Sequence, residues 1–113
     1  MESPIVNLTD ADFAAAVADG ITVVDFWAGW CGPCRAMAPQ FEAASRLRPG
    51  YRFAKVDVDA APAVAAAYGI RSIPTVMVLR DGTPIAAQAG VMAAGVLVDA
   101  VDRVAAQAES EAA

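Results

Sequence analysis

Strand-like and helix-like segments alternate along this chain, and their order restricts the fold more than any other feature. Patterns rich in β-branched and aromatic residues predict strands at 5–7, 21–27 and 51–59, and apolar periodicity predicts helices at 8–20, 34–50, 61–69 and 91–107. Residues 74–90 predict a hairpin, because Asp81-Gly82 separates two apolar runs. Such alternation favours parallel pairing with helices on both faces of a sheet. The sequence therefore predicts an α/β fold, with a mixed sheet of about five strands and four helices in the order βαβαβαββα.

Local signals set several expected boundaries. Thr9, with Asp12 three residues later, has the spacing of a capping box at the start of the first helix. Pro39 lies within the second helical pattern, where proline predicts a bend. Four apolar residues of that segment recur at helical spacing: Met37, Phe41, Ala44 and Leu47. The last helix is amphipathic in pattern, with Val98, Val101, Val104 and Ala105 on one side.

The chain length predicts one domain over residues 1–113, with about 108–113 as a frayed tail. The net charge is −5, with no basic cluster, which disfavours nucleic acid and anionic membrane surfaces as partners. The first residues lack the features of a signal peptide, and no stretch is long and apolar enough to span a membrane. A cytoplasmic protein is the resulting expectation. The absence of histidine excludes Ser-His and Cys-His nucleophilic pairs and zinc sites that use imidazole.

The two cysteines of the chain, Cys31 and Cys34, enclose a Gly-Pro pair. Structural zinc and iron–sulfur centres usually need four ligands, so one pair without histidine argues against them, although a two-thiolate Cu(I) site remains open. A disulfide staple over so short a loop stabilises little, about 1.9 kcal/mol in the chain-entropy model. A pair of inert buried thiols is the remaining non-redox alternative.

The flanking residues favour redox chemistry. Cys31 is expected where a strand ends and a helix begins, and the backbone N–H groups and dipole of a helix N-terminus favour a thiolate. Pro33 fits the first helical turn and stiffens the loop, and Arg35 adds a positive charge nearby. We expect Cys31 to be the exposed attacking thiol and Cys34 the more buried resolving thiol.

Asp25 is the one charged residue in the otherwise apolar strand 21–27. A buried carboxylate is unfavourable unless it is paired or protonated, and burial raises its pKa. Lys55, in the strand 51–59, is the expected partner. Asp25 is either a satisfied structural acid or, beside a dithiol, a proton acceptor near neutral pH. Ile73-Pro74 opens another strand, and general preference favours a trans bond there.

Four segments resemble the thioredoxin family in order and spacing: VVDFWAGWCGPCRAMAP (23–39), AKVDVD (54–59), YGIRSIPTVMVLRDG (68–82) and AG (89–90). The resemblance covers nearly all of the chain and implies a thioredoxin fold. It implies that Cys31 attacks a target disulfide, that Cys34 resolves the mixed disulfide, that Asp25 assists as proton acceptor, and that Cys31–Cys34 closes as the redox disulfide. Gly32, Pro33 and Lys55 would support this site, Pro74 would be cis, and the docking surface for targets would include Trp30, Ile73, Thr75, Gly90 and Val91.

The function implied is a general protein-disulfide reductase. Its partners would be disulfide-containing proteins and an NADPH-dependent flavoprotein, thioredoxin reductase, which would restore the dithiol. No cofactor or metal bound to the chain itself is expected, and a monomer is the default. A thiol oxidant or isomerase, a binding subunit without turnover and a Cu(I) carrier remain as alternatives. The sequence departs from the family at Gly29 and Arg35, and the last helix lacks a Ser or Thr cap and contains Gly95.

Overall fold

Five strands among residues 3–112, the part of the chain that this computed structural model describes, form one mixed sheet. The elements in chain order are β1 (Val6–Leu8), α1 (Phe13–Ala16), β2 (Ile21–Trp27), α2 (Gly32–Leu47), β3 (Arg52–Asp57), α3 (Pro62–Ala67), β4 (Thr75–Arg80), β5 (Thr83–Ala89) and α4 (Ala94–Ala112). The strands lie in the order β1-β3-β2-β4-β5. β1, β3 and β2 are parallel, whereas β4 and β5 are antiparallel to their neighbours. The predicted α/β fold and element order are confirmed.

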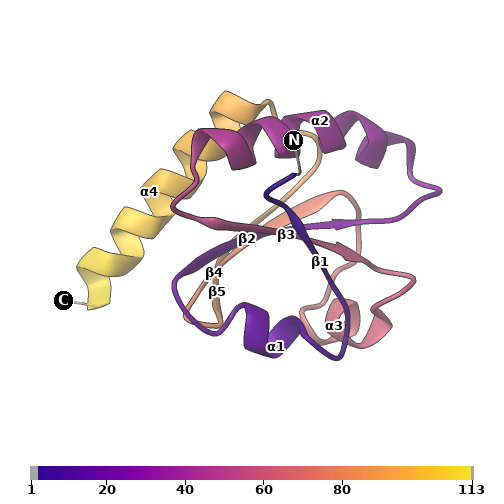
Figure 1. The fold of residues 1–113 in the computed structure, drawn as a ribbon, viewed down its shortest axis with the longest axis horizontal. Helices are drawn as coiled ribbons and strands as arrows, with labels where there is room; N and C mark the ends of the chain where they lie inside the picture. The colour runs from indigo at the N-terminus through magenta and orange to yellow at the C-terminus, as the bar shows by residue number, and fades with distance from the viewer. Residues whose placement is uncertain (1–2, 113) are drawn as a thin grey trace.

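The central position of β2 explains its sequence. It pairs with β3 on one side and β4 on the other, and its residues 22–26 are buried on both faces of the sheet. Helices α1 and α3 cover one face of the sheet, and α2 and α4 cover the other (Figure 1). A strand covered on both faces reads as a nearly continuous apolar run, and the predicted bounds 21–27 agree with the structure.

The hairpin of β4 and β5 turns at Asp81 and Gly82, whose φ angles are 50° and 82°. Two successive positive φ values characterise the type I′ turn, which matches the twist of antiparallel strands. The Asp81 carboxylate accepts a hydrogen bond from Gly20 N at 2.7 Å, and Asp81 N donates to Gly20 O at 2.9 Å. The turn is thereby attached to the loop that precedes β2.

Several boundaries differ from the sequence predictions. The first strand is Val6–Leu8 rather than 5–7, and α1 is only four residues long. Asp12 accepts a hydrogen bond from Thr9 N at 2.6 Å, as in a capping box, but the Thr9 hydroxyl donates to Asp12 rather than capping the helix. Leu47 shares the helical spacing of the buried Met37, Phe41 and Ala44, but it is 52% exposed in the last turn of α2.

Helix α4 is longer than predicted and has a cap that its own sequence does not supply. It continues through residues 108–112 of the segment 108–113 that was expected to fray, and residue 113 lies outside the described residues. Arg80 donates to the Ala108 carbonyl at 2.8 Å. At its start, the Gln40 side chain of α2 accepts a hydrogen bond from Ala94 N at 2.9 Å. A tertiary contact therefore satisfies the helix terminus where a local Ser or Thr is missing.

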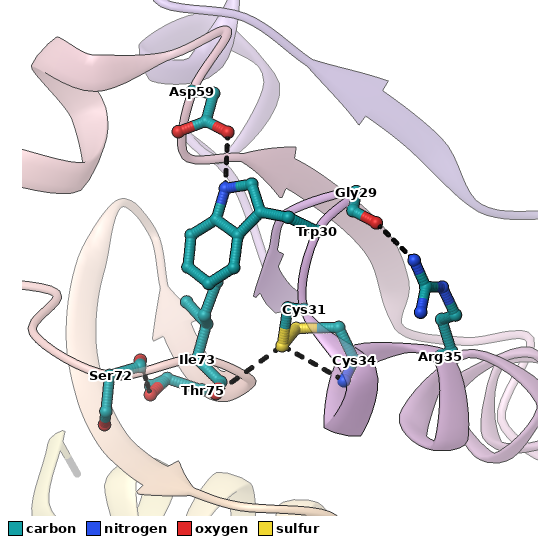
Figure 2. Close-up of a disulfide and its surroundings, with 9 residues drawn as sticks. All are labelled: Gly29, Trp30, Cys31, Cys34, Arg35, Asp59, Ser72, Ile73 and Thr75. Carbon is teal, nitrogen blue, oxygen red and sulfur yellow. Dashed lines mark hydrogen bonds between the residues drawn. A yellow bond between two sulfur atoms is a disulfide. The ribbon is translucent and has the colours of Figure 1, made fainter.

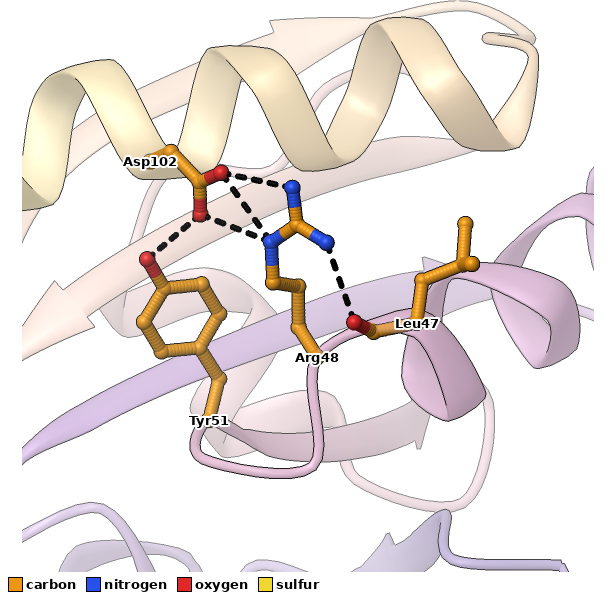
Figure 3. Close-up of polar contacts among 4 residues, drawn as sticks. All are labelled: Leu47, Arg48, Tyr51 and Asp102. Carbon is orange, nitrogen blue, oxygen red and sulfur yellow. Dashed lines mark hydrogen bonds and ion pairs between the residues drawn. The ribbon is translucent and has the colours of Figure 1, made fainter.

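A polar cluster joins the end of α2 to α4 (Figure 3). The Arg48 guanidinium donates to both carboxylate oxygens of Asp102 at 2.8–3.1 Å, and the Tyr51 hydroxyl donates to the same carboxylate at 2.6 Å. These bonds hold the pKa of Asp102 below its usual value, with Arg48 the larger cause. Burial and the bond to Asp102 raise the pKa of Tyr51 to about 12. We call Arg48, Tyr51 and Asp102 the helix clamp.

Candidate functional site

The two cysteines lie where β2 gives way to α2. Cys31 is the N-cap residue of α2, and its Sγ accepts a hydrogen bond from Cys34 N at 3.2 Å. Cys31 and Cys34 form a disulfide, with their Cα atoms 5.3 Å apart (Figure 2). Pro33 occupies the first turn, where the missing N–H leaves no helical bond unmade. The Cys31 sulfur thus lies among the free N–H groups at the positive end of a 16-residue helix.

Both cysteines are buried, which corrects the expectation of an exposed Cys31. Their exposed fractions are 5% for Cys31 and 3% for Cys34. They pack with Ala28, and Trp27 and Ile73 are among the partly buried residues around them. The apolar residues flanking the motif account for this burial, because they close over the disulfide from the β2–α2 loop and from the loop before β4.

Trp30 stands out from this surface and is 68% exposed. Its indole N–H donates to Asp59 at 2.8 Å, and the Arg35 guanidinium donates to the Gly29 carbonyl at 3.0 Å (Figure 2). Both bonds hold the loop just before Cys31. Asp59 was not among the predicted site residues. The predicted topology could have indicated Asp59, because β2 and β3 are parallel and the residues that follow them lie at the same edge of the sheet.

The loop before β4 lies against the disulfide. The Ile73–Pro74 peptide bond is cis, as the family resemblance implies and contrary to the general preference. The Ile73 carbonyl oxygen lies 3.8 Å from Cys31 Sγ. The Thr75 hydroxyl donates to the Ser72 carbonyl at 2.7 Å (Figure 2).

Two further predicted docking residues adjoin this loop. Gly90 N donates to the Pro74 carbonyl at 2.8 Å, which places the segment after β5 beside the proline. Gly90 has a φ of 99°, a conformation that favours glycine. Val91 follows and is 47% exposed. Close contacts therefore run from Cys31 through Ile73 and Pro74 to Gly90, and these residues adjoin one another.

Asp25 is fully buried, and neither of its carboxylate oxygens has a hydrogen-bond partner among the described residues. Burial raises its pKa to about 7, and the charge of Lys55 opposes this rise. Lys55 lies beside Asp25 in the parallel register of β2 and β3, and its Nζ is 4.6 Å from the Trp27 ring centroid. The expected neighbour is thus in place, but as an electrostatic partner rather than a hydrogen-bond donor.

Strand alternation shows which way Asp25 points. Val23, two residues earlier, packs with Met37 and Phe41 of α2. Residues two apart in a strand share a face, so the Asp25 side chain lies on the face that α2 covers. The first turn of the same helix carries Cys34. The fold therefore places a carboxyl with a pKa near 7 on the same side of the sheet as the dithiol.

The described residues contain no group of three or more Cys, Asp or Glu side chains positioned to hold a metal ion. None of the helices within residues 3–112 has the length and apolar character needed to cross a membrane.

The chemistry available to this site is exchange between a dithiol and a disulfide, so the fold and site define a thiol–disulfide oxidoreductase. The Thioredoxin family model matches residues 4–103. A thioredoxin of Staphylococcus aureus is 48% identical over 82 residues, which cover 72% of this chain and 79% of the relative. A Streptomyces coelicolor protein whose name also contains thioredoxin is 41% identical over 97 residues, covering 85% of this chain and 72% of the relative. The chain belongs to the thioredoxin family.

Proposed function

We propose that this chain reduces disulfides in target proteins, with Cys31 as the attacking thiol and Cys34 as the resolving thiol. One observation carries the assignment: Cys31 is the N-cap of α2, and Cys34 N donates to its sulfur. In the reduced protein the same N–H and the helix dipole favour the thiolate of Cys31, which is the nucleophilic form. Cys34 lies inside the first turn, within reach of Cys31.

The reaction transfers two electrons and two protons. The Cys31 thiolate attacks one sulfur of the target disulfide, so that a mixed disulfide forms and the first target sulfur leaves as a thiolate that takes up a proton. Cys34 then loses its proton and attacks Cys31 Sγ. The mixed disulfide breaks, the second target sulfur leaves as a thiolate that takes up the second proton, and the Cys31–Cys34 disulfide closes.

Asp25 is the proton acceptor for Cys34 in this scheme. Its pKa of about 7 means that the carboxyl accepts and returns a proton near neutral pH. Lys55 is a supporting residue, because its charge keeps the carboxyl from an even higher pKa. Since both acid and dithiol are buried, the proton passes through water that enters the site between them.

Target segments dock on the exposed surface around the disulfide. Trp30 and Val91 supply apolar area, and Ile73 and Thr75 flank the cis proline. An extended segment of the target aligns with the backbone of this loop, as in strand addition. Gly32, Pro33, Pro74 and Gly90 support this surface: Gly32 and Pro33 are exposed beside the disulfide, and Gly90 N holds the Pro74 carbonyl.

The dithiol is regenerated by a partner. An NADPH-dependent flavoprotein, thioredoxin reductase, supplies two electrons to the Cys31–Cys34 disulfide. The chain acts as a monomer in the cytoplasm, where structural disulfides are rare and catalytic ones are transient.

Two variants test this proposal. Cys31→Ser should lower the rate at which a disulfide-bonded protein is reduced by dithiothreitol to the rate with dithiothreitol alone. Cys34→Ser should instead accumulate a mixed disulfide with the target, seen as an added mass that a thiol removes. Reduction by Cys31→Ser at the wild-type rate, or trapping by that variant rather than by Cys34→Ser, contradicts the assigned roles.

The direction of electron flow is tested by the reduction potential. Trp27 and Trp30 fluorescence in dithiol redox buffers should report a two-electron transition at a strongly reducing potential. A transition roughly 100 mV higher would identify an oxidant or isomerase instead.

A further inference from the structure

The longest stretch of this chain without charge is residues 82–98, which contain no Asp, Glu, Lys or Arg. It comprises Gly82 of the hairpin turn, all of β5, the following loop and the first five residues of α4. In a protein with 21 charged residues among 113, this leaves one part of the surface neutral. Two exposed valines lie within it, Val91 at 47% and Val96 at 60%.

The same stretch borders an apolar groove between α4 and the β4–β5 hairpin, with a volume of about 420 Å³. Its walls include Ala86 and Ala89 of β5, Ala100 of α4, and Val91, Met92 and Val96 at or near the loop. The one polar side chain in the lining, Gln88, donates to the Ala89 carbonyl at 3.2 Å. The alanines leave the space that larger side chains would fill.

The groove begins where the surface around the disulfide ends. Val91 is part of its lining and directly follows Gly90, whose N–H donates to the Pro74 carbonyl. Pro74 follows Ile73, whose carbonyl lies 3.8 Å from Cys31 Sγ. A target cysteine bonded to Cys31 lies beside this loop, and the loop contacts the segment Gly90–Val91, which leads into the groove.

We propose that this groove is a second binding site for the target polypeptide, which takes aliphatic side chains near the reacting cysteine. The proposal rests on the proposed reductase function and specifies its substrate class: disulfides flanked by apolar sequence, as exposed in unfolded or partly folded chains. A neutral, apolar lining binds aliphatic side chains without removing water from a charged group. Charged or strongly polar side chains beside the target cysteine gain no binding free energy there.

The test compares two synthetic peptide disulfides and one small disulfide. Both peptides are disulfide-linked dimers of equal length, one with leucine and valine on both sides of the cysteine and one with serine and threonine. Hydroxyethyl disulfide is too small to reach the groove. For the wild-type protein we expect kcat/KM for the aliphatic peptide to exceed that for the polar peptide about 10-fold, since one well-buried aliphatic side chain accounts for that ratio.

Val96→Asp places a charge at the rim of the groove. Val96 is exposed and lies in the first turn of α4, where an acidic residue interacts favourably with the helix dipole, so the fold is preserved. We expect this variant to lower kcat/KM for the aliphatic peptide by about 5- to 10-fold and to leave the other two substrates within about 2-fold. Ala100→Leu, which fills the groove without adding charge, should give the same pattern.

Leu47→Asp is the matched control. It makes the same change of charge at a comparably exposed aliphatic residue, about 22 Å along α2 from its first residue. All three substrates should keep their wild-type rates. If Val96→Asp and Ala100→Leu leave the aliphatic peptide unaffected, or slow all three substrates equally, the proposal is wrong.

Two other results separate the proposal from its alternatives. If light scattering gives wild type twice the monomer mass and Val96→Asp the monomer mass, a second copy of the chain occupies the groove and the proposal is overturned. If wild type reduces none of the three disulfides, the reductase function itself fails, whereas equal rates for the two peptides refute only the groove.

Discussion

Two aspartates on the same side of the sheet show how differently this fold treats one kind of side chain. Asp25 is fully buried without a hydrogen-bond partner among the described residues, and burial raises its pKa to about 7. Asp102, on α4, is partly exposed, accepts hydrogen bonds from Arg48 and Tyr51, and has a lowered pKa. The first carboxyl destabilises the fold when it ionises, whereas the second stabilises it.

Under the proposed function, the comparison separates a catalytic from a structural use of charge. The helix clamp satisfies its carboxylate completely and fixes the end of α2 against α4. The site near the disulfide keeps a carboxyl that neutral pH leaves close to half protonated, which suits a group that must take and return a proton. A fold in which every buried polar group were satisfied would be more stable, but it would lack a carboxyl that titrates near neutral pH.

The largest expected effect is on the pH dependence of stability. Asp25 has a folded pKa of about 7 against its ordinary value of 3.8. Its favourable contribution to the free energy of unfolding is complete below pH 3.8 and is lost as the pH rises through about 7. The difference corresponds to about 4 kcal/mol in the free energy of unfolding. The free energy of unfolding of Asp25→Asn, relative to that of wild type, should therefore rise by about this amount between pH 4 and pH 8.

Denaturant unfolding of the oxidised proteins at several pH values measures this gain. Disulfide-bonded samples keep the Cys31 and Cys34 thiols out of the titration. A constant difference between Asp25→Asn and wild type across this pH range would show that Asp25 does not titrate with a raised pKa.

The second expected effect is on turnover. Without a carboxyl to accept the Cys34 proton, Asp25→Asn should resolve the mixed disulfide about 10- to 100-fold more slowly at pH 7, since water replaces the general base. Single-turnover release of a target from the mixed disulfide measures this step. In the wild type the rate should rise with pH and level off above about 7 as Asp25 ionises. If the variant keeps the wild-type inflection, another group accepts the proton.

A smaller loss of stability is expected at the helix clamp. Asp102→Ala removes the partner of Arg48 and of the half-buried Tyr51 hydroxyl, so the free energy of unfolding should fall by about 1–2 kcal/mol at pH 7. Glu109→Ala makes the same charge change at an exposed site on the same helix and should have little effect. Thermal unfolding of both variants makes the comparison.

The pH dependence of this loss has the opposite sign to that of Asp25. Because the pKa of Asp102 is lowered, its contribution to the free energy of unfolding is complete at pH values above the ordinary Asp pKa. This contribution disappears as the pH falls through the pKa of Asp102 in the folded protein. Asp102→Ala and wild type should therefore approach equal stability in acid. If the difference in free energy of unfolding between the two proteins persists at low pH, the loss of stability comes from packing rather than from the carboxylate.

The sequence predicts the disulfide end of the molecule better than the clamp end, for a physical reason. Cys31, Cys34 and Asp25 lie within ten residues, on a strand, a tight loop and a helix N-terminus whose geometry is local. The clamp joins Arg48 and Tyr51 to Asp102, more than fifty residues away. Such pairs depend on how helices pack, and periodicity within one helix does not reveal them.

Tertiary contacts also explain the differences at the ends of elements. Gln40 caps α4 from another helix, and Arg80 bonds to the Ala108 carbonyl within the segment expected to fray. Leu47 has the spacing of a buried residue, but it lies in the last turn of α2, where it is exposed. The apolar pattern predicts the buried face of a helix but not how far along the helix its neighbours extend.

The smallest expected effect concerns Lys55, the charge that opposes the raised pKa of Asp25. Lys55→Met keeps an unbranched apolar side chain but removes the ammonium, so the pKa of Asp25 should rise further. Below pH 4 Asp25 is neutral in both proteins, and the variant should lose only the contact of Lys55 with Trp27, about 0.5–1 kcal/mol.

Above pH 7 the stability of wild type should level off, whereas that of Lys55→Met should continue to fall until its Asp25 ionises. The turnover inflection should move to higher pH in the same variant, because both measurements report one carboxyl. If the two midpoints move together, the charge of Lys55 sets the pH at which Asp25 becomes a proton acceptor. If neither midpoint moves, burial alone determines that pH, and Lys55 contributes only through its contact with Trp27.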